Sequence, residues 1–284
     1  MSRLSQQRVA ITGAGSGLGR AIALAFAGRG WRVAVTDRDL AGASDTLKQV
    51  EAAGGSGFVQ ALDVTREDDF AALADSLTAH WGGVDVLVNN AGVATAGTTV
   101  DASLEQWRWI IDINLLGCVR GARALAPLMT AQRDGHIVNI ASFAGVANPP
   151  AMASYNATKA AVISLSETLR FEMAAFDVGV SVACPSFFKT RLMETSQAQA
   201  REGAPAEATD APAPQMGKIV TRLMEKASVT AEDVADDILG AVLDNRFLVI
   251  THPDARRQYH LKRLAPEWFF RVARRSTAAF LTRR

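Results

Sequence analysis

Short apolar segments alternate along most of this chain with longer segments that have apolar positions at helical spacing. Several of the short segments are apolar throughout, which is typical of parallel strands covered on both faces. The alternation predicts a doubly wound α/β domain, in which a parallel sheet of about seven strands is flanked by helices. The expected strands are residues 9–12, 33–36, 57–61, 86–89, 136–140, 180–183 and 247–250, and the expected helices are residues 18–28, 41–53, 67–81, 104–115, 119–132, 154–176 and 231–243.

Two segments depart from this alternation, and the first is residues 191–229. It contains the sequence GAPAEATDAPAPQMG, whose prolines prevent a continuous helix. A long loop of this kind is either a surface insertion without fixed structure or a functional lid. We favour a lid, because the segment directly follows residues that are expected to contact a ligand. Residues 1–254 would then form a single domain that includes the lid.

The second segment, residues 255–284, contains nine Lys and Arg residues, interleaved aromatic residues and a single acid, Glu267. One interpretation is a basic amphipathic helix that lies on an anionic membrane. The other is a C-terminal helical extension that packs its aromatic side chains on the domain or on a second subunit. We favour packing, because amphipathic helices ordinarily cover a core.

Composition and charge argue against several classes of protein. The 284 residues carry a formal net charge of +1, which gives no reason to expect a nucleic-acid partner. Cys118 and Cys184 lie far apart, without a CxxC motif or a Cys/His cluster, so neither a metal site nor a disulfide is expected. No apolar run reaches the length of a membrane span, and residues 1–7 do not look like a signal peptide. We therefore expect a cytoplasmic protein.

The first expected strand leads directly into the sequence TGAGSGLG at residues 12–19, and a helix follows. Glycines let the backbone turn tightly and approach a pyrophosphate, whose charge the N-terminus of the next helix can bind. A glycine-rich turn without a ligand is the alternative, and the position between strand and helix argues against it. The residues expected to contact a dinucleotide here are Gly13, Ser16, Gly17, Leu18 and Gly19.

Residues at the ends of the second and third strands bear on the choice of dinucleotide. Asp37 lies about 20 residues after the glycines, where an acid can bind both hydroxyls of the adenosine ribose and so favours NAD. Arg38 leaves NADP open, because a guanidinium can pair with a 2′-phosphate. Asp63, which precedes Val64, is either an acceptor for the adenine amino group or a turn cap. We favour NAD, and we include Val64 among the cofactor contacts.

Tyr155 and Lys159 are four residues apart on an expected helix and therefore share a face. A neighbouring ammonium stabilises a phenolate, so we expect Lys159 to lower the pKa of Tyr155 and make it a general acid/base. Alone, such a pair could lie on the surface by chance. Ser142 follows the fifth strand, at the edge where α/β sheets bind ligands, and could donate a hydrogen bond to a carbonyl oxygen.

Together these motifs resemble those of the short-chain dehydrogenase/reductase family, which is built on one Rossmann-type domain. The resemblance covers residues 5–253 and lies in the glycine turn, Asn89-Asn90-Ala91-Gly92, Asn114, Ser142 and Tyr155-x3-Lys159, in the family's order. It implies that Tyr155 is the acid/base, that Lys159 also binds the nicotinamide ribose, and that Ser142 polarises the substrate oxygen.

The resemblance also gives roles to residues outside this trio. It implies that Asn114 holds a water molecule in a proton relay from Lys159, although a locally satisfied helix residue is the alternative. It implies that Asn90, Ala91 and Gly92 border the adenosine and the ribose. The family usually has Pro-Gly-x3-Thr beside the nicotinamide, where this chain has PSFFKT at residues 185–190. Pro185, Phe188 and Thr190 are therefore expected cofactor contacts, and Ser186 would be strained if its φ were positive.

The predicted function is hydride transfer between NAD, or NADP, and a secondary alcohol or ketone. The apolar segments 93–97, 143–152, 187–188 and 192–193 favour a lipophilic substrate. The alternative is a non-catalytic, dinucleotide-sensing regulator, which would gain nothing from Ser142, Tyr155 and Lys159 together. The family resemblance also implies a homo-oligomer, either a tetramer or a dimer.

Overall fold

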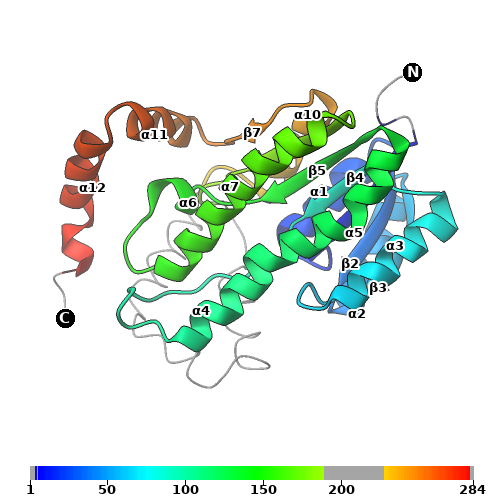
Figure 1. The fold of residues 1–284 in the computed structure, drawn as a ribbon, viewed down its shortest axis with the longest axis horizontal. Helices are drawn as coiled ribbons and strands as arrows, with labels where there is room; N and C mark the ends of the chain where they lie inside the picture. The colour runs from blue at the N-terminus through cyan, green and yellow to red at the C-terminus, as the bar shows by residue number, and fades with distance from the viewer. Residues whose placement is uncertain (1–3, 5, 189–226, 282–284) are drawn as a thin grey trace.

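A seven-stranded parallel sheet forms the centre of the computed structural model, which describes residues 4, 6–188 and 227–281 and, of these, the side chains up to residue 275. The strands lie in the order β3-β2-β1-β4-β5-β6-β7 (Figure 1). This arrangement confirms the predicted doubly wound parallel sheet. The strands are β1 (Arg8–Thr12), β2 (Arg32–Asp37), β3 (Ser56–Ala61), β4 (Val86–Asn89), β5 (Gly135–Ile140), β6 (Val178–Ala183) and β7 (Leu248–Val249).

Helices cover both faces of the sheet. On one face, α1, α2 and α10 pack on the sheet, and on the other face α3, α5 and α7 do so, with α5 and α7 turned to the viewer in Figure 1. The helices are α1 (Gly17–Ala27), α2 (Leu40–Ala52), α3 (Glu67–Trp81), α4 (Leu104–Ile111), the π-helix η1 (Asp112–Leu116), α5 (Gly117–Gln132), α6 (Ala144–Ala147), α7 (Ala153–Ala174), α10 (Ala231–Leu243), α11 (Pro253–Leu264) and α12 (Pro266–Leu281).

The apolar strands owe their composition to burial on both faces. In β1, Val9 and Ile11 point into the core beneath α1 and α10, while Ala10 points into the core beneath α3 and α5. In β4, Val86 and Val88 lie on the first side and Leu87 lies on the second. Successive side chains of a strand point to opposite faces, so neither face of these strands can be polar. Burial on both faces therefore explains why these strands are apolar throughout.

The structure corrects several sequence-based boundaries. The helix expected at residues 104–115 ends at Ile111 and continues as the π-helix η1. The short helix α6 was not predicted, and β7 is shorter than the strand expected at residues 247–250. The C-terminal extension contains two helices, α11 and α12. Most of the segment 191–229, the expected lid, lies outside the described residues. Among those that are described, no helix is long and apolar enough to span a membrane.

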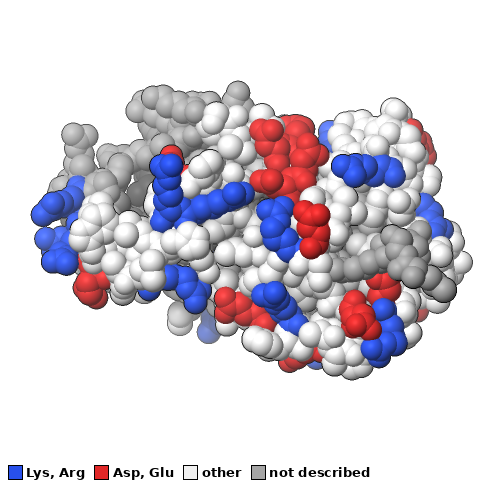
Figure 2. Space-filling model, turned by 90° about the horizontal axis from the view of Figure 1, so that it is seen from above, with Lys and Arg blue, Asp and Glu red and all other residues white. Residues whose placement is uncertain are grey.

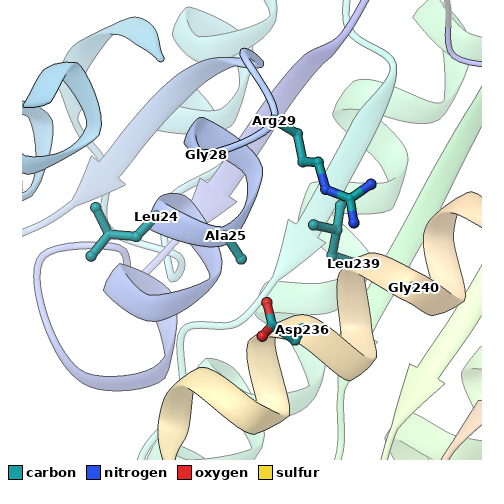
Figure 3. Close-up of a pocket in the computed structure, with 7 residues that line it drawn as sticks. All are labelled: Leu24, Ala25, Gly28, Arg29, Asp236, Leu239 and Gly240. Carbon is teal, nitrogen blue, oxygen red and sulfur yellow. The ribbon is translucent and has the colours of Figure 1, made fainter. Parts of the chain in front are cut away.

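A shallow depression lies between α1 and α10 (Figure 3). Arg29 and Asp236 lie on its two sides. Gly28 and Arg29 follow the C-terminus of α1, and since α1 runs antiparallel to the strands, they lie at the amino edge of the sheet. The glycine turn lies at the other end of the same helix. The depression is therefore separate from the residues predicted to bind a dinucleotide, and it is lined by Leu24, Ala25, Gly28, Arg29, Asp236, Leu239 and Gly240.

A buried ion pair holds the amino edge of the sheet together. Arg8 donates to Asp85 through Nε (3.0 Å) and Nη2 (2.7 Å), and its backbone N–H donates to the same carboxylate (2.8 Å). Arg8 also donates to the Trp81 carbonyl and to the Gln132 side chain, so its guanidinium is well satisfied. A buried charge that loses its partner is strongly destabilising, whereas an exposed pair contributes little. Asp85 was not singled out from the sequence.

We predict that Asp85→Ala lowers the free energy of unfolding by about 3–5 kcal/mol, because it leaves the Arg8 guanidinium buried without its carboxylate. Denaturant unfolding measures this change. Glu105→Ala, which breaks the exposed pair between Glu105 and Arg108, is the matched control and should cost less than about 1 kcal/mol. Equal losses in the two variants would contradict the assignment of Asp85 as the stabilising partner.

Candidate active site

The carboxyl ends of four adjacent strands bring the predicted site residues to one edge of the sheet. The strands β1, β4, β5 and β6 are neighbours and run parallel. The segments that follow them must therefore meet at the same edge. These segments are the glycine turn after β1, Asn90 to Gly92 after β4, Ser142 after β5, and Pro185 to Phe188 after β6.

The glycine turn packs directly on the segment after β4. Gly13 has a φ of +65°, and a Cβ on it would lie 2.9 Å from the Ala91 Cα. A Cβ on Gly19 would lie 2.1 Å from the Gly13 carbonyl oxygen. Asn90 donates from Nδ2 to the carbonyls of Thr12 (2.9 Å) and Gly13 (3.0 Å). The turn can therefore adopt this path only with glycine at both positions.

The N-terminus of α1 has backbone N–H groups available for an anion. Ser16 occupies the N-cap position, and its side chain makes no capping hydrogen bond. The first N–H groups of a helix have no partner within the helix, and the helix dipole adds positive potential there. Gly17 and Leu18 form the first turn, and Gly17 has a φ of +52°. This end of α1 therefore has the chemistry of a phosphate site.

Asp37 has a structural role that the sequence did not predict. Its carboxylate accepts hydrogen bonds from the backbone N–H groups of Gly15 (2.9 Å) and Asp39 (2.9 Å). The side chain thus ties the glycine turn to the end of β2. An ionised carboxylate has about four acceptor positions, so Asp37 retains capacity for a ligand. Arg38, beside it, is exposed.

Asp63 forms a turn after β3. Its Oδ1 accepts from the backbone N–H (2.9 Å) and the hydroxyl (2.7 Å) of Thr65. These contacts match the turn-cap interpretation of Asp63, and its contact with adenine stays a prediction. Val64 packs against α5, since a Cβ on Gly117 would lie 3.1 Å from the Val64 Cβ.

Tyr155 and Lys159 are both buried on α7, with exposed fractions of 7% and 5%. The Lys159 Nζ donates to the Ile140 carbonyl at the end of β5 (2.8 Å) and lies 5.9 Å from the centre of the Tyr155 ring. The Ser142 side chain lies close enough to the Tyr155 hydroxyl to influence its pKa. The Ser142 Oγ also accepts from the Ala144 N–H (3.1 Å), which fixes the hydroxyl at the start of α6.

The structure corrects the expected pKa of Tyr155. Burial raises the pKa of Tyr155 above its usual value, and the nearby Ser142 hydroxyl opposes this shift. Burial also lowers the pKa of Lys159. The sequence predicted that the ammonium would lower the pKa of Tyr155, but Nζ is bonded to the Ile140 carbonyl and burial is the largest influence on the phenol. Burial thus works against the charged form of each side chain.

Asn114 lies in the π-helix and is tied to the chain after β4. Its Oδ1 accepts from the Val93 N–H (2.8 Å), and its Nδ2 donates to the Val93 carbonyl (2.9 Å). A Cβ on Gly92 would lie 3.1 Å from the Asn114 Oδ1 and 3.4 Å from the Lys159 Nζ. Gly92 therefore lies next to both Asn114 and Lys159, and it has no side chain that would extend toward either of them. Short π-helical turns are frequent at functional sites.

The family assignment follows from comparison with known proteins. The family model described as short chain dehydrogenase matches residues 7–201. The chain belongs to the short-chain dehydrogenase family. This result confirms the resemblance found in the sequence, and it identifies the chain as a member of a family of oxidoreductases.

Two solved short-chain dehydrogenase structures resemble this chain over most of its length. One, from Burkholderia phymatum and in complex with NAD, has a TM-score of 0.84 and 33% identity over 94% of this chain and 96% of that chain. The other, a metagenomic short-chain oxidoreductase in complex with NADP, has a TM-score of 0.68 and 29% identity over 87% of this chain and 96% of that chain.

A curated relative extends beyond the aligned region. The protein named "Probable oxidoreductase EphD", from Mycobacterium tuberculosis, is 35% identical over 271 residues, which are 95% of this chain and 44% of the relative. The present chain thus spans less than half the length of the first curated relatives that it matches.

His252, which was not singled out from the sequence, holds the loop after β6. Its Nε2 lies 2.9 Å from the Phe187 carbonyl, and its Nδ1 accepts weakly from the Ser186 N–H (3.4 Å). The Phe143 N–H donates to the Pro185 carbonyl (2.9 Å) on the other side of the loop. The φ of Ser186 is not positive, so the strain considered from the sequence does not occur. His252 lies 66 residues away from Ser186 along the chain, so no local motif could reveal the contact.

A second buried contact supports the start of α7. The hydroxyls of Thr95 and Ser154 lie 2.7 Å apart, and both side chains are buried. Ser154 precedes Tyr155, so this contact ties the chain after β4 to the helix that carries Tyr155. Of the expected cofactor contacts, Pro185 and Phe188 lie on the loop held by His252, and Thr190 lies outside the described residues.

We predict that His252→Ala weakens dinucleotide binding about tenfold, because the loop after β6 loses two hydrogen bonds that hold it at the sheet edge. Isothermal titration calorimetry with NAD measures the change in Kd. His260→Ala removes an exposed histidine of α11 and is the matched control, with an unchanged Kd expected. If the two variants bind NAD equally well, His252 does not position this loop for the cofactor.

Proposed function

We propose that this chain catalyses hydride transfer between a nicotinamide dinucleotide, NAD in preference to NADP, and a lipophilic secondary alcohol or ketone. The observation that carries the proposal is the buried Tyr155, close to Ser142 and to Lys159, at the edge where the glycine turn also lies. The NAD and NADP complexes among the structural relatives support a nicotinamide cofactor.

The residues at the sheet edge fit such a cofactor. The uncapped N-terminus of α1 offers N–H groups to a pyrophosphate, and the glycines allow the turn to pack closely against Ala91 and Asp37, where side chains would collide. Asp37 would accept from the hydroxyls of the adenosine ribose while it continues to hold the Gly15 N–H. Asn90, Ala91 and Gly92 would border the ribose, and the loop from Pro185 to Phe188 would border the nicotinamide.

Tyr155 would move the hydroxyl proton of the substrate. In the oxidation direction the phenolate of Tyr155 accepts this proton, and in reduction the phenol returns it to the carbonyl oxygen. Ser142 would donate a hydrogen bond to the substrate oxygen. The oxidised nicotinamide, when bound, accepts the hydride, and its positive charge opposes the rise in the pKa of Tyr155 that burial causes.

Lys159 and Asn114 would take part in the transfer of the proton between Tyr155 and solvent. An ammonium has three N–H donors, and one of them is used by the Ile140 carbonyl. The others are available for the nicotinamide ribose and for a water molecule beside Gly92. Asn114 already bonds Val93 through both ends of its amide, and it would hold that water with remaining lone-pair capacity.

The proposed substrate is lipophilic because apolar side chains surround Tyr155. Tyr155 belongs to a buried cluster with Val93, Ala94, Ile110 and Met152, and Trp109 and Phe187 pack against this cluster. A pocket with apolar walls and few polar groups binds lipophilic ligands better than sugars or phosphates. The lid expected at residues 191–229 stays a prediction, because most of that segment lies outside the described residues. The homo-oligomer and the cytoplasmic location stay predictions.

We predict that Tyr155→Phe lowers turnover by about 10²–10⁴-fold while dinucleotide binding is retained, because the ring still packs but can no longer transfer a proton. Absorbance of the reduced nicotinamide, followed with a panel of secondary alcohols and ketones, measures the rate. The matched control is Tyr259→Phe, which removes the chain's other tyrosine hydroxyl, on α11. Unchanged turnover in Tyr155→Phe would exclude Tyr155 as the acid/base. A chain that binds NAD but turns over nothing in the panel would instead favour the regulator.

We predict that Asp37→Ser shifts the ratio of kcat/KM for NAD to that for NADP at least about tenfold toward NADP, because the carboxylate repels a 2′-phosphate. Steady-state rates with the two cofactors in parallel measure this ratio. Asp39→Ser is the matched control, since Asp39 lies nearby, its carboxylate caps α2, and serine is also a good N-cap. A preference of the unmodified chain for NADP would contradict the proposed role of Asp37.

A further inference from the structure

The two C-terminal helices form an arm (α11 and α12) whose base is fixed to the domain. Ala255 of α11 is buried, and Tyr259 packs against the cluster that contains Phe143 and Val146. Lys262 donates to the Val146 carbonyl. These contacts confirm that part of the tail packs on the domain, as the favoured sequence interpretation expected. The base of the arm therefore has a fixed position beside α6.

The second helix of the arm, α12, packs mainly on α11 and lies at one end of the molecule (Figure 1). Trp268, Phe270 and Val272 are exposed, with fractions of 48%, 60% and 45%. No residue of α12 whose side chain is described belongs to the buried clusters of the domain. These three apolar side chains of α12 are therefore not packed in the protein core that amphipathic helices ordinarily cover.

The polar side of α12 is basic. At 3.6 residues per turn, Arg271, Arg274 and Arg275 fall on one side of the helix. Phe269 and Ala273 fall on the other side, Val272 and Phe270 lie at the two boundaries, and Trp268 lies beside Arg275 on the basic side. Glu267 is the single acid between residues 255 and 284.

The positive charge extends over the whole arm. Arg256, Arg257 and Arg263 of α11 are exposed. In Figure 2, Lys and Arg side chains gather at the left end of the molecule, which is the end of α11 and α12 in Figure 1, while acidic side chains are concentrated over the middle. On α12 the arginines are flanked by two exposed aromatic side chains, Trp268 and Phe270, and this combination of basic and aromatic residues suits the interface of an anionic membrane.

We propose that α12 binds the surface of anionic lipid membranes, with Trp268 and Phe270 in the interface and Arg271, Arg274 and Arg275 at the headgroups. Residues near the surface of an anionic membrane contribute about 1 kcal/mol per Lys or Arg, or about fivefold in affinity. The arm provides several such residues together with its aromatic side chains. Binding of this kind requires no membrane-spanning helix.

A second copy of the chain is a less suitable occupant of this surface. A standard protein interface buries about 800 Å² on each partner. Aromatic side chains bury about 150–250 Å² each when they are fully covered. Trp268, Phe270 and Val272 are already about half covered, so they would supply less than half of that area. Binding to a membrane does not need this buried area, because each arginine is also attracted electrostatically to the anionic headgroups.

Co-sedimentation of the full chain with vesicles tests the proposal. We expect binding to vesicles made of equal amounts of phosphatidylcholine and phosphatidylglycerol, little binding to phosphatidylcholine alone, and a decrease with added salt. Arg271→Glu/Arg275→Glu should weaken binding by at least about 25-fold, or about fivefold per arginine removed. Trp268→Ala/Phe270→Ala should also reduce binding, because it removes the side chains that enter the interface.

Matched controls separate the arm from general charge and hydrophobicity. Lys48→Glu/Arg123→Glu reverses two exposed charges on α2 and α5, and Phe171→Ala removes an exposed aromatic side chain on α7. These variants should bind as the unmodified chain does, and all variants should keep its thermal unfolding midpoint. The proposal is overturned if the full chain does not bind the anionic vesicles, if it binds neutral vesicles equally, or if the control variants lose as much binding. It is also overturned if Trp268→Ala/Phe270→Ala reduces the mass in sedimentation equilibrium but leaves vesicle binding unchanged, which would identify a second copy.

Discussion

The ammonium of Lys159 is buried, and a buried charge needs hydrogen-bond acceptors. The Ile140 carbonyl supplies one of them and thereby joins α7 to the end of β5. This bond sets the position of the helix face that carries Tyr155, and Ser142 follows Ile140 two residues later. The Lys159 Nζ also lies near Gly92, where a Cβ would be 3.4 Å from Nζ and 3.1 Å from the Asn114 Oδ1. The geometry of the candidate site therefore depends on the hydrogen bonds that the buried Lys159 side chain makes.

At the cofactor end of the site, a single residue, Asp37, also has more than one role. The Asp37 carboxylate holds the Gly15 and Asp39 N–H groups, and it is also the group proposed to bind the adenosine ribose. A change at this position affects the shape of the glycine turn as well as the charge beside the ribose. Cofactor preference in this chain is thus coupled to the stability of the turn, and a serine is a milder replacement than an apolar residue because it retains an acceptor.

Much of the fold could be predicted because local residues carry the information. The predicted helices at residues 67–81 and 231–243 agree with α3 and α10. Local residues mark the end of α3 and the start of α10. Gly82 ends α3 with a φ of +72°, and Thr230 and Asp233 form a capping box at the start of α10. The strands were recognisable because both of their faces are buried. Periodicity could not distinguish η1 from the end of a longer α4, because the same residues form both kinds of helix.

The candidate site could be located from the sequence, but its electrostatics could not. The spacing of Tyr155 and Lys159 puts them on one face, yet the direction of the pKa shift depends on burial by residues distant in the chain. The contacts of Asp85 and of His252 join segments far apart in the sequence, so no motif reveals them. Long-range polar contacts of this kind are what the structure adds to the sequence.

The position of the arm connects the two proposals. Its base packs on the cluster that includes Phe143 and Val146, and Phe143 directly follows Ser142. A membrane that holds α12 would therefore also lie near the end of the domain that carries the proposed catalytic serine. Lipophilic alcohols and ketones partition into membranes, where their local concentration exceeds that in water. A helix that keeps the chain at such a surface would raise the supply of substrate without any change in the chemistry of Tyr155.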